Sequence, residues 1–309
     1  MTARTVVAAA LSRAGLFART SFGKGLGWLP DVDDGRDLTD EQALYGLALD
    51  DPRSSDWRPY GPPRADQGFT SECVGEATAR ALATMERIAG LPPVELSPRQ
   101  PYYGGRRLST PYDQKVVDHG VQPRDVMEYV RENGICTLGA CPRSFAKINW
   151  RPTRTARREA TARSGGMYFR VIGTGDKRGE AIRKLLGVGL IPEAGIRVTQ
   201  SYQRAAGPDV IDYPAPDDAY AGLHYQAIDA HQIDEKYECL YFWENSWGAW
   251  RLDGGAWLTH RLVCSPLVSD VRVMVGHDYV QRLFDGSSDP KIAAWRRALA
   301  NLTEAHLVA

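Results

Sequence analysis

The sequence predicts an α+β protein in which helices come first and strands come later. Two observations carry this prediction. In the first half, apolar residues recur at helical spacing from Cys73 to Ala89, and two further helix-start patterns follow. In the second half, short segments rich in aromatic and β-branched residues are bounded by polar or glycine breaks, as strands usually are.

Each helix is predicted from its own start and stop signals. The helix that begins at Cys73 ends before Gly90, with two prolines just beyond it. The string SPRQ at 97–100 is a capping-box pattern with a proline suited to the first helical position. The string QPRDVMEYVRENG at 122–134 repeats this logic and stops at a glycine, and a further helix is expected near 176–187.

The strands are predicted from four short segments, and the chain closes with another helix. The segments HYQAIDAH, YECLYFW, GAWLT and VRVMV span 224–231, 237–243, 255–259 and 271–275. Within residues 286–309, one helical stripe carries Ile292, Trp295, Leu299 and Leu302. We expect this C-terminal helix to dock on the body or on a partner chain.

Composition excludes several classes of protein. The chain has 309 residues and a formal net charge of zero without long runs of like charge, so nucleic-acid binding is not expected. The sequence lacks an apolar run long enough to span a membrane and a convincing signal peptide, and its five cysteines are irregularly spaced. We therefore expect a cytoplasmic protein in a reducing compartment.

The cysteine at the start of the first helix is a candidate nucleophile. Unsatisfied backbone N–H groups at a helix start favour a thiolate, although a cysteine there is more often a small buried hydrophobe. His224 is a candidate base, and Asn245 follows it by 21 residues with a carbonyl suited to orient the imidazole. Trp247 is expected to shield that hydrogen bond from water.

These residues lie in four strings that together resemble the papain family of cysteine peptidases, in its bacterial and phage branch. The strings are DQGFTSEC, LSPRQPYYGGRRL, GLHYQAIDA and NSWGAW, in the family's order. Gln67 precedes Cys73 by six positions as in the family, and His224 follows Cys73 by 151 residues. The resemblance covers about residues 56–275.

The resemblance implies a fold, an activity and a role for each residue. It implies a papain-like fold of two lobes with the active site in the cleft between them: a helical lobe (about 56–165) and a β-barrel-like lobe (about 166–285). Residues 1–55 then form an N-terminal extension or arm. Cys73 would be the nucleophile, His224 the base, Asn245 its orienter and Gln67 an oxyanion donor.

Gly120 and Trp247 are the residues that we expect on the substrate side of the cleft. The implied reaction is the hydrolysis of peptide bonds in a peptide or protein substrate by a cysteine endopeptidase, without cofactor or metal. A zinc site built from Cys136, Cys141, Cys239 and Cys264 is disfavoured, because the spacing of the first pair is not that of a zinc knuckle and the other two are isolated.

The chain departs from the family beside the nucleophile, where Thr70, Ser71 and Glu72 stand in place of the usual Cys-Gly-Ser. We expect a solvated Glu72 whose charge only partly opposes a low thiol pKa at Cys73. The carboxylate of Glu72, because it stands beside the candidate nucleophile, keeps a second hypothesis open. In that hypothesis the chain is an inert papain-like module of a larger assembly, for example a phage particle, which it contacts through the N-terminal arm or the C-terminal helix.

Overall fold

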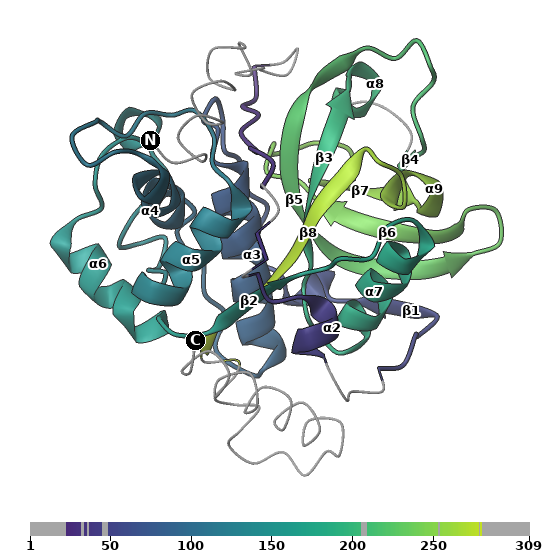
Figure 1. Cartoon of the computed structure of the whole chain (residues 1–309), viewed down its shortest axis with the longest axis horizontal. Helices are drawn as coiled ribbons and strands as arrows, with labels where there is room; N and C mark the ends of the chain where they lie inside the picture. Colours follow the sequence, from purple (N-terminus) through teal and green to yellow (C-terminus); the bar gives the residue numbers. More distant parts are fainter. Residues whose placement is uncertain are drawn as a thin grey trace.

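Helices and strands gather on two sides of the molecule (Figure 1). The structure is a computed structural model that describes residues 23–31, 34–35, 37–44, 49–204, 209–252, 254–277 and 279. The predicted α+β class is confirmed. The predicted C-terminal helix lies outside the described residues and stays a prediction.

The helical side contains the longer helices of the first half. These are α3 (Cys73–Ile88), α4 (Arg99–Ser109), α5 (Pro123–Asn133) and α6 (Arg154–Ala160). The strands are β1 (Ser54–Asp56), β2 (Met167–Arg170), β3 (Glu193–Thr199), β4 (Val210–Ile211), β5 (Tyr220–Asp234), β6 (Glu238–Glu244), β7 (Gly255–Thr259) and β8 (Val268–Val275). The other helices are α2 (Asp40–Ala43), α7 (Asp176–Gly187), α8 (Gln200–Gln203), α9 (His260–Val263), and the 3-10 turns η1 (Arg58–Tyr60), η2 (Phe145–Lys147) and η3 (Thr161–Arg163).

The described strands form one sheet in the order β2-β8-β3-β5-β6-β7-β4, with β1 added beside β5. The pairs are antiparallel except for β4 with β7. Within the described residues no ladder joins β2 to β4, so the lobe that we expected to be barrel-like is an open sheet. All four predicted strand segments lie in it.

Strands β1 to β4 were not predicted. Strand β3 opens with Glu193 and contains Gly195, and both residues are unusual in strands. The glycine is needed because the ring of Trp28 packs on it, 2.3 Å from where a Cβ would lie. The composition of β3 therefore reflects a contact with a segment far away in the sequence.

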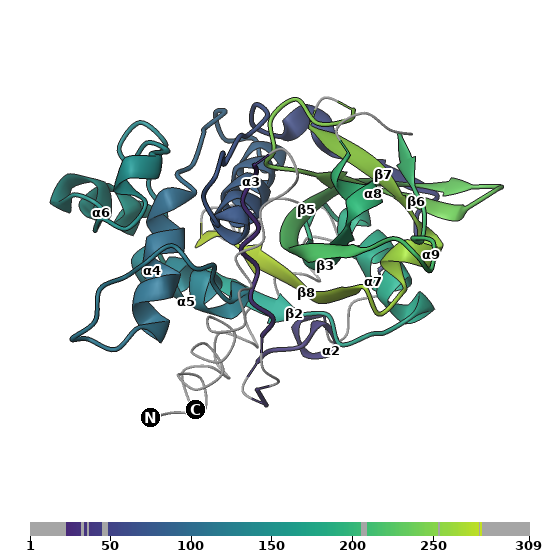
Figure 2. The ribbon, with the colours of Figure 1, turned by 90° about the horizontal axis from the view of Figure 1, so that it is seen from above.

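Helix α3 lies at the boundary between the helical side and the sheet, which we call the seam (Figure 2). Its apolar residues, among them Val74, Leu82 and Met85, are buried as the helical spacing predicts. Its polar face is buried as well, because the sheet covers it. Arg80 there donates to Asp229 and Glu244 at 2.8 and 2.7 Å.

The start of α4 shows half of the predicted capping box. Ser97 Oγ accepts from the Gln100 backbone N–H at 3.3 Å, and Pro98 already has helical φ and ψ. The Gln100 side chain does not accept a hydrogen bond from the Ser97 backbone N–H, which donates to Cys136 O. Its Oε1 accepts from the Cys136 N–H at 2.8 Å, so it ties α4 to the loop after α5.

Within the described ranges, no helix has both the length and the apolar character that crossing a membrane requires.

Loss of the Arg80 charge should destabilise the fold strongly, because Asp229 and Glu244 would remain as buried carboxylates without their cation. We expect Arg80→Met to lower the free energy of unfolding by about 3–5 kcal/mol in a urea titration. The matched control is Lys184→Met, which breaks the exposed pair with Glu180 on α7 and should change it by about 0.5 kcal/mol or less. Equal effects of the two changes would contradict the role given to Arg80.

Candidate active site

Cys73 is the first residue of α3 and is fully buried. The backbone amides of Gly27 and Tyr225 lie against its thiol. Burial raises the pKa of the thiol to about 12 and outweighs these amides. In this arrangement Cys73 is a neutral thiol, in contrast to the low pKa that we expected from the helix start.

His224 lies in the middle of β5, and Asn245 follows directly after β6. His224 Nε2 and Asn245 Oδ1 are 2.9 Å apart, and the Trp247 ring stacks on the imidazole at a centroid distance of 4.4 Å. Trp247 is itself buried, so it shields the His–Asn hydrogen bond. Burial lowers the pKa of His224 to about 4, so the imidazole is neutral.

The Asn245 hydrogen bond uses Nε2 of His224 and leaves Nδ1 unused. Nδ1 is buried and meets no hydrogen-bond partner in the described part of the chain, the Cys73 thiol included. The two residues lie near one another because the backbone amide of Tyr225, the residue after His224, lies against the Cys73 thiol.

Gln67 is positioned by the turn that carries Asn245. Its backbone N–H donates to Ser246 O at 2.8 Å, and its Oε1 accepts from the Ser246 hydroxyl. The side-chain N–H group donates to Thr70 O at 2.7 Å and to Gly25 O at 3.2 Å. The donor expected for a substrate oxyanion therefore already contacts a carbonyl of the N-terminal region.

That carbonyl belongs to residues 23–31, named here the strap, which runs between the helical side and the sheet (purple in Figure 1). The strap packs backbone against backbone. A Cβ at Gly25 would lie 1.8 Å from Thr70 O, and one at Gly27 would lie 1.9 Å from Ser71 O. Only glycine permits this approach to the loop that precedes Cys73.

The second half of the strap pairs with the segment that contains Gly120. Gly27 O accepts from the Val121 N–H at 3.0 Å, and the Leu29 N–H donates to Val121 O at 3.1 Å. The Gly120 N–H donates instead to the Tyr102 hydroxyl. The residue that offers backbone hydrogen bonds in the cleft is thus Val121, beside the one we predicted.

Trp28 anchors the strap in the sheet. Its ring is buried against Gly195 and Tyr225, and its Nε1 donates to Asp270 Oδ2 at 3.0 Å. Asp31 ends the strap with an ion pair to Arg272 at 2.8 Å. Asp31 also accepts from the Arg124 backbone N–H at 3.1 Å, in the first turn of α5.

Glu72 is buried, and our expectation that it is solvated is wrong. One of its carboxyl oxygens accepts from the Thr70 hydroxyl at 2.9 Å, and the other meets no partner among the described residues. Burial and the neighbouring Glu76 raise the pKa of Glu72 to about 8. The carboxyl group beside Cys73 is therefore mostly neutral at pH 7.

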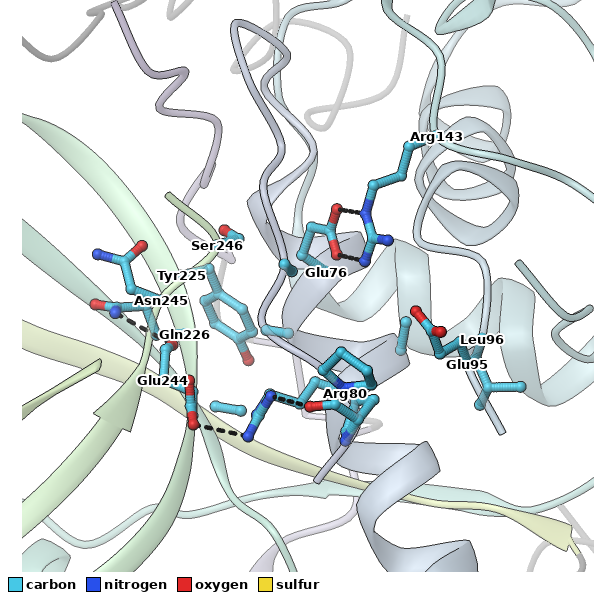
Figure 3. A pocket seen from close by; sticks show the side chains of 16 residues that line it. Glu76, Arg80, Glu95, Leu96, Arg143, Tyr225, Gln226, Glu244, Asn245 and Ser246 are labelled. Atoms are coloured by element: carbon cyan, nitrogen blue, oxygen red, sulfur yellow. Dashed lines mark hydrogen bonds and ion pairs between the residues drawn. The ribbon is translucent and has the colours of Figure 1, made fainter. Parts of the chain in front are cut away.

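A small cavity lies between α3 and the sheet, behind Asn245 and Ser246 (Figure 3). Ion pairs stand on its two walls, Glu76 with Arg143 and Arg80 with Glu244. Its volume of about 30 Å³ holds one water molecule and excludes a peptide. The buried seam at Cys73 is filled by the strap.

The strap residues were missed as functional residues in the sequence. Their signal is the alternation of glycines at 23, 25 and 27 in GKGLGW, followed by a tryptophan. Alternate glycines in an extended segment indicate that one face of the backbone approaches another closely. Asp270 carries no such signal, because only the fold brings it to Trp28.

Solved structures with a similar overall fold include cysteine proteases. Xylellain, a cysteine protease from Xylella fastidiosa, superposes with a TM-score of 0.70 at 21% identity, over 84% of this chain and 97% of its own. The chain has the papain-like fold. Procathepsin L 3 from the larval midgut of Tenebrio molitor gives 0.60 at 14% identity, over 87% of this chain and 79% of its own.

A third structure, procathepsin B S9 from Trypanosoma congolense, gives a TM-score of 0.59 at 13% identity, over 90% of this chain and 99% of its own. No family model and no curated protein sequence matches the chain. At these identities the likeness establishes the papain-like fold, and the fold that the four sequence strings implied is confirmed.

A methyl group on the strap should open the site. In Gly27→Ala the new Cβ collides with the Ser71 backbone, so the strap must leave or shift. We expect iodoacetamide to alkylate Cys73 at least about tenfold faster than in the unaltered chain, because the thiol loses its cover. The matched control is Gly35→Ala, where a Cβ meets nothing within 4 Å. Equal rates in all three proteins would show that the strap does not protect Cys73.

The charge of Glu72 should affect Cys73 only at alkaline pH. Because the pKa of Glu72 is raised to about 8, its carboxyl is neutral below pH 7 and becomes an anion beside the thiol above pH 8. In the chain with its strap in place, where Glu72 keeps its cover, we expect Glu72 and Glu72→Gln proteins to be alkylated at similar, slow rates at pH 6.5. At about pH 9 the Glu72 protein should be about five- to tenfold slower, because the anion disfavours the thiolate. A rate ratio that does not change with pH would contradict this pKa.

Proposed function

We propose that the chain is a cysteine peptidase that cleaves peptide bonds within a protein or peptide substrate. The observation that carries this proposal is the convergence of three groups on the start of α3. Cys73 stands there, the backbone amide beside His224 lies against its thiol, and the Gln67 side chain near it in the sequence is held by Ser246. The related folds are those of cysteine proteases, which favours the same reaction.

The residues support a two-step acyl transfer. His224 Nδ1 takes the proton of Cys73 Sγ, and the sulfur attacks the carbonyl carbon of the substrate. The oxyanion accepts from Gln67 Nε2 and from the Cys73 backbone N–H. His224 then returns the proton to the leaving amine, and water cleaves the thioester by the same route in reverse order.

Asn245 acts through the histidine. Its Oδ1 accepts from Nε2–H, so the neutral imidazole presents Nδ1 to the cleft, and Trp247 keeps water from this hydrogen bond. The substrate would lie extended along Val121, whose N–H and C=O already bind the strap backbone. Of the two residues that we predicted to contact substrate, we assign Trp247 to the support of His224.

We propose further that the strap holds this peptidase in a latent state. Gly25 O contacts the oxyanion donor, the Gly27 amide lies against the thiol, and both Cys73 and His224 are neutral under this cover. Displacement of the strap would return water to the site and lower the pKa of the thiol towards values that permit the thiolate–imidazolium pair.

The second candidate is the inert papain-like module. It is favoured by one observation, the neutral pair of Cys73 and His224 in a closed cleft. An inert module would keep its thiol unreactive even after the strap has been displaced. The reactivity of Cys73 in a chain with a displaced strap therefore distinguishes the two functions.

The test uses the Gly27→Ala protein, in which the strap is displaced. We expect an epoxide inhibitor of papain-like enzymes to label Cys73, located by mass spectrometry, and a fluorogenic peptide library to be cleaved. Cys73→Ala and His224→Ala in this background should each lower kcat/KM by about three orders of magnitude or more, since each removes a reacting group. Asn245→Ala should lose less, because it only loosens the orientation of His224.

The matched control is Cys136→Ser, which replaces a buried thiol outside the site and should leave labelling and kcat/KM unchanged. Folding of each variant is checked by its urea midpoint. Folded Gly27→Ala protein that is neither labelled nor active would favour the inert module. Activity that survives Cys73→Ala would exclude the proposed nucleophile.

A further inference from the structure

Metal-ligating side chains gather at a second place, where α7, α9 and the start of β6 meet. Asp176 is the first residue of α7, His260 is the first residue of α9, and Cys264 directly follows α9. One donor atom from each lies within 4.8 Å of the others. Glu238, the first residue of β6, adds a second carboxylate.

The donor atoms of Asp176, His260 and Cys264 are close enough for one coordination shell, whereas Glu238 lies near His260 only. His260 Nε2 is 3.2 Å from Asp176 Oδ1, 3.4 Å from Cys264 Sγ and 3.8 Å from Glu238 Oε2. Ligand atoms around a tetrahedral Zn²⁺ with bonds of about 2.0–2.3 Å are about 3.3–3.7 Å apart. The sulfur is also 3.6 Å from His260 Nδ1, so a turn about the Cα–Cβ bond of Cys264 is needed to bring it fully to the Nε2 side.

The histidine is held so that Nε2 faces these acidic groups. Its other nitrogen, Nδ1, is 3.1 Å from the hydroxyl of Tyr241, which also accepts from Arg183 at 3.2 Å. A hydroxyl oxygen accepts two hydrogen bonds, so it can take Nδ1–H as well and leave the Nε2 lone pair for a metal. An outer partner of this kind is usual for a histidine that binds a metal.

The surrounding backbone makes room for the cluster. A Cβ at Gly179 of α7 would lie 2.7 Å from the His260 ring and from the Tyr241 hydroxyl, and 3.0 Å from Cys264 Sγ. Glu238 has a φ of 63°, a left-handed conformation that is uncommon for residues other than glycine. The left-handed Glu238 closes the three-residue turn between β5 and β6, and Gly179 leaves room for the three donors.

We propose that His260, Cys264 and Asp176 bind Zn²⁺, and that the exposed Glu238 side chain must turn towards them to supply the fourth ligand. A thiolate, an imidazole and carboxylates suit Zn²⁺ and do not suit Ca²⁺ or Mg²⁺, which take oxygen ligands. The ion would add a bond between α7, α9 and the start of β6, which already contact one another. This proposal is independent of the peptidase function.

Binding requires the loss of one proton. Zn²⁺ binds the thiolate of Cys264, so the thiol proton goes to solvent when the ion binds.

The test uses the full chain with Cys73→Ala, so that neither the candidate catalytic thiol nor self-cleavage contributes. We expect Co²⁺ to bind with one ion per chain and to give a thiolate-to-cobalt charge-transfer band, which Zn²⁺ then abolishes by displacement. Excess Zn²⁺ should raise Tm by about 5 °C or more. Cys264→Ser should remove the band, and Asp176→Asn, a change at an exposed side chain, should weaken Zn²⁺ binding at least about tenfold.

The matched control is Cys239→Ser, which replaces a buried thiol of β6 and should keep the band, the stoichiometry and the Tm shift. Absence of Co²⁺ and Zn²⁺ binding at millimolar metal would overturn the proposal. A band that persists in Cys264→Ser, or that is lost in Cys136→Ser, would also overturn it, because other thiols would then hold the ion.

Discussion

Burial of α3 between the helices and the sheet is the constraint on which the rest of the structure depends. A helix covered on all sides cannot keep its polar residues in water, so each charged side chain needs a partner across the seam. Arg80 meets Asp229 and Glu244, and Glu76 meets Arg143. The Arg80 pairs fix α3 against the sheet, the Glu76 pair ties it to the loop after α5, and the start of the same helix places Cys73 near β5.

Much of the fold was predictable because its signals are local. Helical spacing, a proline at a helix start and a glycine at its stop were sufficient for α3, α5 and α7, and aromatic and β-branched runs were sufficient for β5 to β8. Strand β3 was not predicted, because its Gly195 is explained only by the packing of the distant Trp28 ring on it. The open form of the sheet also depends on pairings between distant segments, which no short string encodes.

The candidate site was also predictable only in part. The chemistry of Cys73, His224, Asn245 and Gln67 is carried by residue types at recognisable spacing, so the strings pointed to them. The protonation state of these groups could not be predicted in this way, because it depends on the segments that bury them. The low thiol pKa and the solvated Glu72 were inferred from sequence neighbours, whereas burial under the strap and the loop before Cys73 reverses both.

The strap is part of the same chain as the cleft that it fills, and this tether has a kinetic consequence. A short tether holds a segment at an effective concentration on the order of millimolar, whatever the dilution of the protein. After one peptide bond is cut on the C-terminal side of Asp31, the same segment competes only at its bulk concentration, about a thousandfold lower for a micromolar protein. A single cleavage would thus weaken the hold of the strap on the cleft about a thousandfold without altering any contact inside it.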